Sequence, residues 1–330
     1  MMSANTLLSS IDPPLLRPLV VILGPTAVGK TGIAIQVAES LSAEIISADS
    51  RLLYTGMDVG TAKPTLTERS RIRHHLIDVT PPDQIWSLAQ YQTAAYQTID
   101  AIHQRKRLPI LVGGTGQYIH AITQGWKIPP ANPDTALRKA LESWAELIGY
   151  QGLHDRLAHL DPQAAQAIDP PNVRRTIRAL EVIFTTGHTF SEQKSRLAPP
   201  YKIYQIGIIR PRPELYQRID ERIDEMLAAG FIDEVRGLLD QGYLPNLPAL
   251  SAIGYSEIVS YIQGECSLDA AITQIKRRIR IFVRRQANWF KPTDSTIHWF
   301  QVCQDTPTLI VQTIRAWLNS LPANATNQKQ

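Results

Sequence analysis

Residues Gly24 to Thr31 have the sequence GPTAVGKT, which is the GxxxxGK[ST] pattern of a phosphate-binding loop. The glycines allow the backbone to curl so that its N–H groups point at an anion. The Lys30 ammonium can reach the terminal phosphate, and the Thr31 hydroxyl can hold Mg²⁺. The pattern therefore predicts a site for a di- or triphosphate. The residues expected to line it are Gly24, Pro25, Thr26, Ala27, Val28, Gly29, Lys30 and Thr31.

The segments on either side favour a phosphate loop over a glycine-rich turn before a surface helix. Residues 18–23 are a short apolar run rich in β-branched residues, which predicts a strand. Residues 32–39 have an apolar face at helical spacing. Strand, loop and helix in this order are the context that the pattern requires. We therefore expect an α/β fold of the P-loop NTPase type, with a parallel sheet flanked by helices.

Two further polar residues follow predicted strands. Asp49 comes directly after residues 43–48, and Thr115 lies in a GGTG turn after residues 108–112. In an open parallel sheet, ligands bind outside the carboxyl ends of the strands, so both side chains are expected to face the phosphate loop. On position alone, Asp49 could equally cap the turn that follows it. A GGTG sequence is by itself more often a tight turn than a site.

The composition changes from about Trp126. A proline-rich break at 129–134 is followed by helical stretches without an obvious strand, until residues 201–209 again have the pattern of a strand. We therefore expect an all-helical domain inserted into the P-loop core. The expected boundaries are 17–125 and 200–322 for the two parts of the core, 126–199 for the insertion, and 1–16 and 323–330 for flexible tails.

The overall composition is that of a globular protein of 330 residues with a net charge of +4. The two cysteines, Cys266 and Cys303, fit no disulfide framework or zinc pattern, which indicates a reducing compartment. The first twelve residues lack the pattern of a secretory signal, and no apolar run approaches the ~20 residues needed to cross a bilayer. We expect a cytoplasmic protein, a monomer with no membrane partner.

Basic residues gather in two stretches. Those of the expected insertion are Arg138, Arg174, Arg175 and Arg178. Arg174 and Arg178 are four residues apart and share a helix face. A predicted helix at 268–290 carries the second group, Lys276, Arg277, Arg280 and Arg284, opposite its expected apolar stripe of Ile275, Ile279, Phe282 and Trp289. A basic stripe is typical of a phosphodiester-binding surface, although a solvated cationic face would have the same pattern.

The chain closely resembles the bacterial tRNA dimethylallyltransferases (tRNA isopentenyltransferases) from about Pro18 to Trp317. The segments that carry the resemblance are GPTAVGKT, IISADSRLLYTGMDVGTAKP, LVGGTGQYIHAI, RALEV, SAIGYSE and RRQANWF, in that order. The resemblance implies prenyl transfer rather than phosphoryl transfer. Members of this family move the dimethylallyl group of dimethylallyl diphosphate to the exocyclic N6 amine of the adenosine 3′ to the anticodon, in tRNAs that read codons beginning with U.

The resemblance also implies roles for individual residues. Asp49 matches the carboxylate that orients and deprotonates the attacking amine, and Thr115 matches a threonine near the diphosphate and the reacting centre. Lys30, Mg²⁺ and the loop N–H groups would spread the charge of the leaving diphosphate. Arg218 and Arg222 are further candidates for diphosphate contacts. The tRNA contacts implied by the resemblance, or by the basic helix, are Asp49, Ser50, Arg51, Leu52, Thr115, Arg138, Arg174, Arg175, Thr176, Ile177, Arg178, Arg280 and Arg284.

The target adenine cannot react while it is stacked, so the family must flip it out of the anticodon loop. Two residues depart from the family pattern: Leu52 stands where many relatives have Gln, and Gln117 where Leu is frequent. Two alternatives stay open. The protein could be a small-molecule kinase with ATP in the loop, or an adenylate isopentenyltransferase that acts on free AMP or ATP. The long basic C-terminal half argues against both.

Overall fold

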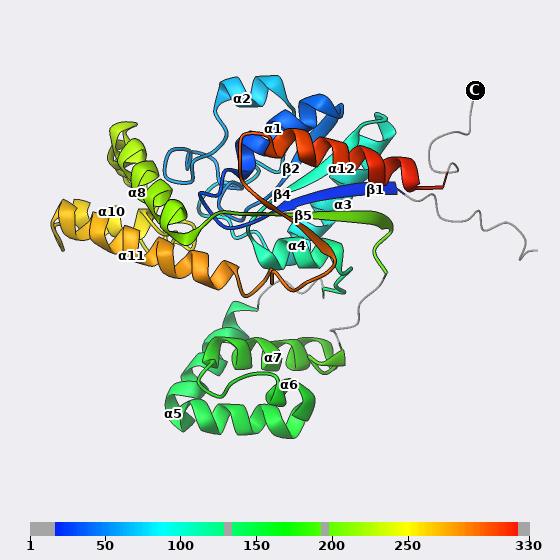
Figure 1. The fold of residues 1–330 in the computed structure, drawn as a ribbon. Coiled ribbons are helices and arrows are strands. Elements are labelled where there is room, and N and C mark those ends of the chain that lie inside the picture. Colours follow the sequence, from blue (N-terminus) through cyan, green and yellow to red (C-terminus); the bar gives the residue numbers. More distant parts are fainter. Residues whose placement is uncertain (1–16, 129–133, 193–197, 323–330) are drawn as a thin grey trace, which may run out of the picture. The chain divides into compact units, whose positions relative to one another are not determined.

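The computed structural model describes residues 17–128, 134–192 and 198–322. They form two compact units (Figure 1), of which the first contains the chain up to Thr123 and from Pro199 onwards, and the second contains Gln124–Ala198. The tails expected at 1–16 and 323–330 lie outside the described residues. Each unit has its own hydrophobic core. No helix in the part of the chain described is both long and apolar enough to cross a membrane.

The first unit is built on a six-stranded sheet in which every pairing is parallel. The strands lie in the order β3-β2-β4-β1-β5-β6. Their bounds are β1 Arg17–Leu23, β2 Ala43–Ala48, β3 His74–His75, β4 Leu108–Gly113, β5 Tyr201–Ile209 and β6 Ile297–Gln301. A sheet covered on both faces needs strands that are apolar throughout, and the side chains from Leu19 to Leu23 are all fully buried. The expected parallel α/β fold is confirmed.

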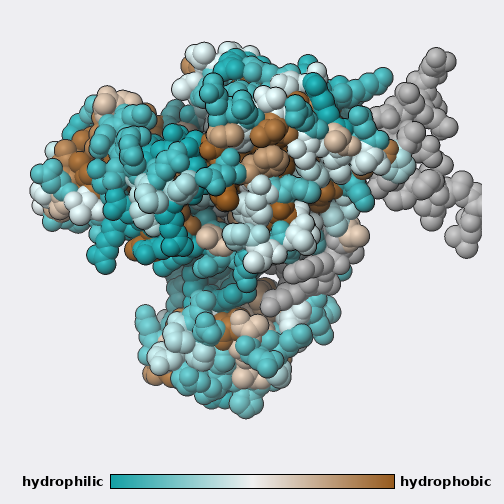
Figure 2. Space-filling view, in the orientation of Figure 1, coloured by the Kyte–Doolittle hydropathy of each residue, from teal (hydrophilic) through white to brown (hydrophobic). Residues whose placement is uncertain are grey.

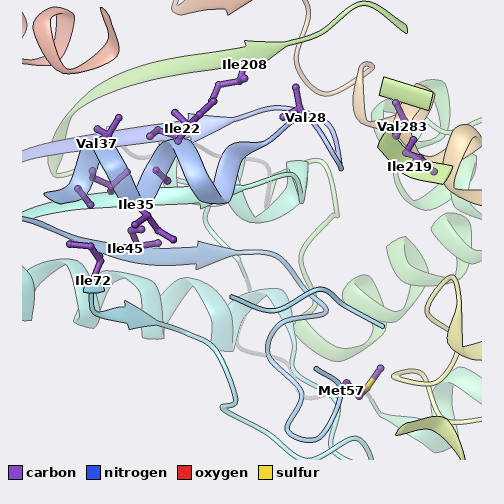
Figure 3. Packing of buried hydrophobic residues seen from close by; sticks show 14 of the residues in the cluster. Ile22, Val28, Ile35, Val37, Ile45, Met57, Ile72, Ile208, Ile219 and Val283 are labelled. Carbon is purple, nitrogen blue, oxygen red and sulfur yellow. The ribbon is translucent and has the colours of Figure 1, made fainter. Parts of the chain in front are cut away.

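Helices cover both faces of this sheet. The helices of the unit are α1 Lys30–Ser40, α2 Leu66–Arg71, α3 Leu88–Gln104, α4 Gly116–Thr123, α8 Arg212–Ala228, α9 Phe231–Asp240, α10 Tyr255–Ile262, α11 Leu268–Gln286 and α12 Thr306–Ser320. Alternate residues of β1 point to opposite faces. Val20 and Ile22 pack with α1 and α12, while Leu19 and Val21 pack with α3 and α4. Figure 3 shows Ile22 close to residues of α1 on the first face.

Helices α8 and α11 pack against each other through a small apolar seam. Ile219 of α8 and Val283 of α11 are buried and lie side by side in Figure 3. The apolar stripe expected on α11 is correct at Ile275 but wrong at Phe282 and Trp289, which are exposed. The buried positions near the end of this helix are instead Val283, Gln286 and, just beyond it, Phe290.

In its described residues, the second unit consists of helices: α5 Thr135–Leu160, α6 Pro162–Gln166 and α7 Val173–Thr186. Helix α5 is interrupted at Gly149, whose φ of 74° is left-handed and therefore favours glycine. Helix α7 ends at Gly187, which takes the left-handed C-cap conformation. The core of this unit is formed by leucines of α5, alanines of α6, and Ile177, Ala179 and Leu180 of α7, together with Ile168.

Candidate active site

The GPTAVGKT loop joins the central strand β1 to α1. A side-chain Cβ at Gly24 would lie 2.5 Å from the carbonyl oxygen of Ile208, so only glycine allows the loop to pass so close to β5. Gly29 has a φ of 103° and begins α1 without a side-chain cap. The first N–H groups of α1 therefore remain available to an anion at the positive end of the helix.

Lys30 is the most strongly perturbed cation at this loop. Its ammonium donates to the carbonyl oxygen of Pro25 at 2.7 Å. Burial lowers the pKa of Lys30 to about 8, the Asp49 carboxylate opposes this change, and the Arg222 guanidinium adds to it. Asp49 and Arg222 are thus close enough to act on the Lys30 ammonium electrostatically. With a pKa of about 8, Lys30 is mostly protonated at neutral pH, and a diphosphate bound beside it would stabilise the charged form further.

Asp49 and Thr115 come just after two neighbouring strands, β2 and β4, whose ends are in register. Ala48 of β2 pairs with Gly113 of β4, and the Thr115 N–H donates to the Ala48 carbonyl oxygen at 3.2 Å. The Ser50 N–H donates to the Thr115 hydroxyl at 3.2 Å. The hydroxyl and the carboxylate are therefore tied together by one short backbone segment at the carboxyl end of the sheet.

Asp49 also caps its own turn, because the Arg51 N–H donates to Asp49 Oδ1 at 2.9 Å. The capping and catalytic interpretations of Asp49 are therefore compatible. An ionised carboxylate has two oxygens and several lone pairs, so this hydrogen bond leaves capacity to accept a proton from a substrate amine. The Arg51 side chain donates to the carbonyl oxygen of Pro248, which holds this turn against the segment before α10.

Three arginines that follow β5 surround the phosphate loop. Arg218 Nε donates to the Ala27 carbonyl oxygen at 3.0 Å, and Arg222 Nη2 donates to the Thr61 carbonyl oxygen at 3.3 Å. Burial lowers the pKa of Arg222, although Asp49 opposes this effect. The third arginine was not predicted from the sequence: Arg210 Nε donates to the loop at Val28, at 2.9 Å. Arg210 directly follows a strand, which is the signal that could have identified it.

Glu234 of α9 holds the segment GMDVGTAKP and was also not predicted. Its carboxylate accepts the backbone N–H groups of Asp58, Val59 and Gly60 at 2.7, 2.6 and 3.0 Å. The hydroxyl of Tyr255 donates to the same carboxylate at 2.6 Å. Arg222 donates to the next carbonyl oxygen of this loop, that of Thr61. Glu234 therefore fixes the backbone segment to which Arg222 is hydrogen-bonded.

The helical unit contains a correction to the expected tRNA contacts. Arg174 and Arg175 are exposed, as an RNA contact requires. Thr176 and Ile177 are buried, at 0 % and 5 % exposed, so the expectation that their side chains contact tRNA is wrong for this structure. Ile177 packs in the core of the unit, and the Thr176 hydroxyl donates back to the carbonyl oxygen of Asn172.

Two further arginines of this unit are engaged by the buried carboxylate of Glu181. Arg138 donates to both oxygens of Glu181 at 2.7 Å, and Arg178 contacts the same carboxylate at 3.4 Å. The bidentate pair joins α5 to α7. A buried carboxylate requires such a partner, so Arg138 has a structural task that the sequence pattern did not show.

Helix α11 presents an open concave patch, here called the α11 patch. It is lined by Thr273, Lys276, Arg277, Arg280 and Arg284. Figure 2 shows mostly hydrophilic side chains over the surface formed by α8 and α11. Arg277 and Arg284 are exposed. Arg280 is different, because it pairs with Asp220 of α8 at 2.6 Å and lies over the ring of Tyr216.

Thr31, the expected Mg²⁺ ligand, lies in the first turn of α1 with its side chain exposed. No cluster of three or more His, Cys, Asp or Glu side chains among the described residues could form a metal cage. Mg²⁺ characteristically keeps several waters and is held by a few protein oxygens together with substrate phosphates. An accessible hydroxyl beside a phosphate loop fits that mode of binding.

Fold and site together define the class of protein. A GxxxxGKT loop at the carboxyl end of a central strand of an all-parallel sheet, with a helix start, a half-buried lysine and three arginines around it, is the arrangement of a P-loop protein.

Comparison with known proteins narrows this class to a family. Residues 52–293 match the family model described as "IPP transferase". A tRNA dimethylallyltransferase of Thermomicrobium roseum is 47 % identical over 288 residues, which are 87 % of each chain. This chain therefore belongs to the IPP transferase family, that of the tRNA dimethylallyltransferases.

Two solved structures agree with that assignment. The tRNA isopentenylpyrophosphate transferase of Bacillus halodurans has 40 % sequence identity and a TM-score of 0.69, with 92 % of this chain and 97 % of that one covered. A eukaryotic dimethylallyltransferase acting on tRNA has 25 % identity and a TM-score of 0.79, with 93 % and 80 % covered.

Proposed function

We propose that this protein transfers the dimethylallyl group of dimethylallyl diphosphate to the N6 amine of the adenosine 3′ to the anticodon, in tRNAs that read codons beginning with U. The products are N6-isopentenyladenosine and diphosphate. The observation that carries the proposal is that Lys30, held on the phosphate loop after β1, and Asp49, directly after β2, lie at the carboxyl ends of strands of one parallel sheet, where the Asp49 charge acts on the Lys30 ammonium. This arrangement brings together a cation suited to a leaving diphosphate and a carboxylate suited to an attacking amine.

The phosphate loop supplies the first half of this chemistry. As the bond between the dimethylallyl carbon and oxygen breaks, negative charge grows on the diphosphate. The Lys30 ammonium and the N–H groups at the start of α1 are directed at that charge and stabilise the transition state. Arg218 and Arg222, which are anchored on the carbonyl oxygens of Ala27 and Thr61, add positive charge at the same place.

Asp49 supplies the second half. The adenine N6 amine is a weak nucleophile because its lone pair is delocalised into the ring. A carboxylate that accepts a hydrogen bond from the amine orients it and removes a proton as the new carbon–nitrogen bond forms. A role for Thr115 in orienting the reactants is supported by the hydrogen bond that its hydroxyl accepts from the Ser50 N–H, next to Asp49.

We also propose that Mg²⁺ binds at the phosphate loop, with the Thr31 hydroxyl as its protein ligand. When bound, it would supply further positive charge to the diphosphate.

For the RNA, we propose that the anticodon arm contacts Ser50, Arg51 and Leu52 beside Asp49, and exposed arginines of both units. These are Arg174 and Arg175 on α7, and Arg277 and Arg284 on the α11 patch. Arg280 would have to exchange the Asp220 carboxylate for a phosphate, so it is the weaker candidate on this helix. We further propose that the protein acts as a monomer. A tRNA substrate and free cysteines support the cytoplasm as its location.

The test is a comparison of acceptors with labelled dimethylallyl diphosphate. Purified protein is incubated with unmodified tRNA, with AMP and with ATP, and ATP hydrolysis is followed separately. The proposal predicts label in tRNA alone. Label in AMP or ATP would favour an adenylate isopentenyltransferase. ATP turnover without use of the prenyl donor would favour a kinase.

A further inference from the structure

Gln286, the last residue of α11, is a buried polar side chain that the proposed chemistry does not use. It is 5 % exposed. It lies on the buried side of a helix whose exposed side carries the α11 patch, and buried amides of this kind require partners for both ends of the group.

Both ends of the Gln286 amide are satisfied, and by two different loops of the site. Oε1 accepts the backbone N–H of Thr26 in the phosphate loop at 2.9 Å. Nε2 donates to the backbone carbonyl oxygen of Gly114 at 3.1 Å. Gly114 directly precedes Thr115, whose hydroxyl holds the segment that carries Asp49. One side chain therefore connects the loop for the leaving group to the loop for the attacking base.

The amide of Gln286 lies very close to the backbone of Gly114. A Cβ on Gly114 would lie 2.5 Å from Gln286 Nε2 and 3.1 Å from the carbonyl oxygen of Gly24. The glycine at this position thus allows the amide of Gln286 and the phosphate loop to approach the GGTG turn closely. Any larger residue there would displace the amide.

We propose that Gln286 is a positioning residue, which sets the separation between the phosphate loop and the turn that carries Thr115 and Asp49. It touches neither reactant. Its effect is on the distance between the diphosphate and the base, which the two loops hold separately. This inference rests on the proposed function for its catalytic consequence, but the bridge itself can be tested without substrate.

Substrate-free hydrogen–deuterium exchange tests the bridge. In the Gln286→Ala protein, exchange should rise in peptides that contain residues 24–31 and 113–116. The matched control is Gln274→Ala, which removes an exposed glutamine from the same helix and should change neither peptide. Unchanged exchange in both loops of Gln286→Ala would overturn the inference, whatever reaction the protein catalyses.

Steady-state kinetics test the catalytic consequence. Misplacing reacting groups by a fraction of an ångström is costly, so Gln286→Ala should lower kcat about tenfold to a hundredfold. The affinity for dimethylallyl diphosphate should change less than about threefold, because the lysine and the arginines that bind it remain. A loss confined to affinity, or an unchanged kcat, would contradict a positioning role. An inactive wild-type protein would instead contradict the proposed function.

A double-mutant cycle with Gly114→Ala separates positioning from general damage. If Gly114→Ala acts by displacing the Gln286 amide, it should lower kcat strongly in the wild type and clearly less in the Gln286→Ala background. Two fully additive losses would show that the residues act independently, and the bridge would then have no catalytic role.

Discussion

Asp49 has two tasks at once, since one of its oxygens caps a turn and its charge acts on the half-buried Lys30 ammonium. This argues for Asp49→Asn as the informative substitution, because the Asn carbonyl oxygen can still accept the Arg51 N–H. The expected result is a turnover lower by about 10²-fold or more, with the fold intact. Single-turnover transfer to tRNA measures it.

The Asp49 experiment needs a pH at which Lys30 stays charged. The Asp49 carboxylate opposes the burial that lowers the pKa of Lys30, so the neutral Asn should lower that pKa further. At about pH 6.5 the lysine remains protonated in both proteins, and donor affinity should then be similar. Near-normal turnover under these conditions would remove Asp49 from the role of base.

The pKa of Lys30 predicts how the binding of dimethylallyl diphosphate depends on pH. Its pKa is lowered by burial to about 8, so the free protein holds a charged ammonium below pH 8 and loses it above. The affinity for dimethylallyl diphosphate should therefore fall as the pH rises through about 8. Titration calorimetry at several pH values measures this. In Lys30→Arg the cation persists, and the fall near pH 8 should disappear.

At the scale of elements, the loop between β2 and α2 depends on α9. Glu234 accepts three backbone N–H groups of this loop and also the hydroxyl of Tyr255 in α10. Glu234→Ala leaves these donors without an acceptor and should lower the free energy of unfolding on the order of 2–3 kcal/mol. Its neighbour Asp233 is exposed and pairs with Arg236 of the same helix, so Asp233→Ala is the matched control. Equal denaturant midpoints for the two variants would contradict a stabilising role of the hydrogen bonds that Glu234 accepts.

Strand β2 provides a pH-dependent contribution to stability. Burial alone would raise the pKa of Glu44, but hydrogen bonds from Arg105 and His75 outweigh it and lower that pKa to about 2. A carboxyl whose pKa is lower in the folded state stabilises the fold above its unfolded value of 4.5. That contribution, on the order of 3 kcal/mol, is lost as the pH falls from about 4.5 towards 2. In urea unfolding experiments over this pH range, the free energy of unfolding should fall more steeply for the wild type than for Glu44→Gln.

Much of the core followed from local pattern, and the exceptions have physical causes. Strands β1 and β4 are short runs of almost wholly apolar residues, and β2 and β5 are mostly apolar and rich in isoleucine, so their local sequence predicts them without tertiary information. Strand β6, Ile297–Gln301, is half-exposed and carries His, Trp and Gln, so no pattern predicted it. On α11 the helical spacing wrongly predicted that Phe282 and Trp289 are buried. The polar residue Gln286 lies on the buried side instead, where it is hydrogen-bonded to two loops.

The site was predictable where a residue type alone specifies chemistry. Lys30, Asp49 and Thr115 follow strands of a phosphate-loop protein, and that position is readable from sequence. The partners of Glu234 and Gln286 are distant in sequence and are backbone groups, which no side-chain pattern reports. The expected tRNA contact of Thr176 was wrong because the side chain of Thr176 is buried. The spacing of the neighbouring arginines does not show which side of α7 faces the core.

For the whole molecule, electrostatics should govern RNA affinity. Arg277 and Arg284 are exposed on the α11 patch, so replacing both with Ala should weaken tRNA binding and reduce its salt slope by about 1 per residue. Lys202→Ala is the control, since this exposed lysine lies at the amino end of β5, away from the site. A slope equal to that of the wild type would leave α11 with a structural task only.

Mass analysis of nucleosides from tRNA treated with this protein and dimethylallyl diphosphate tests the central claim most directly. That claim is that a phosphate loop here holds a prenyl donor while Asp49 activates an RNA base. The account predicts that one dimethylallyl group replaces a hydrogen of the adenosine 3′ to the anticodon, and that Asp49→Asn nearly abolishes this product. Unmodified adenosine at that position, or equal product from the Asp49→Asn protein, would contradict it.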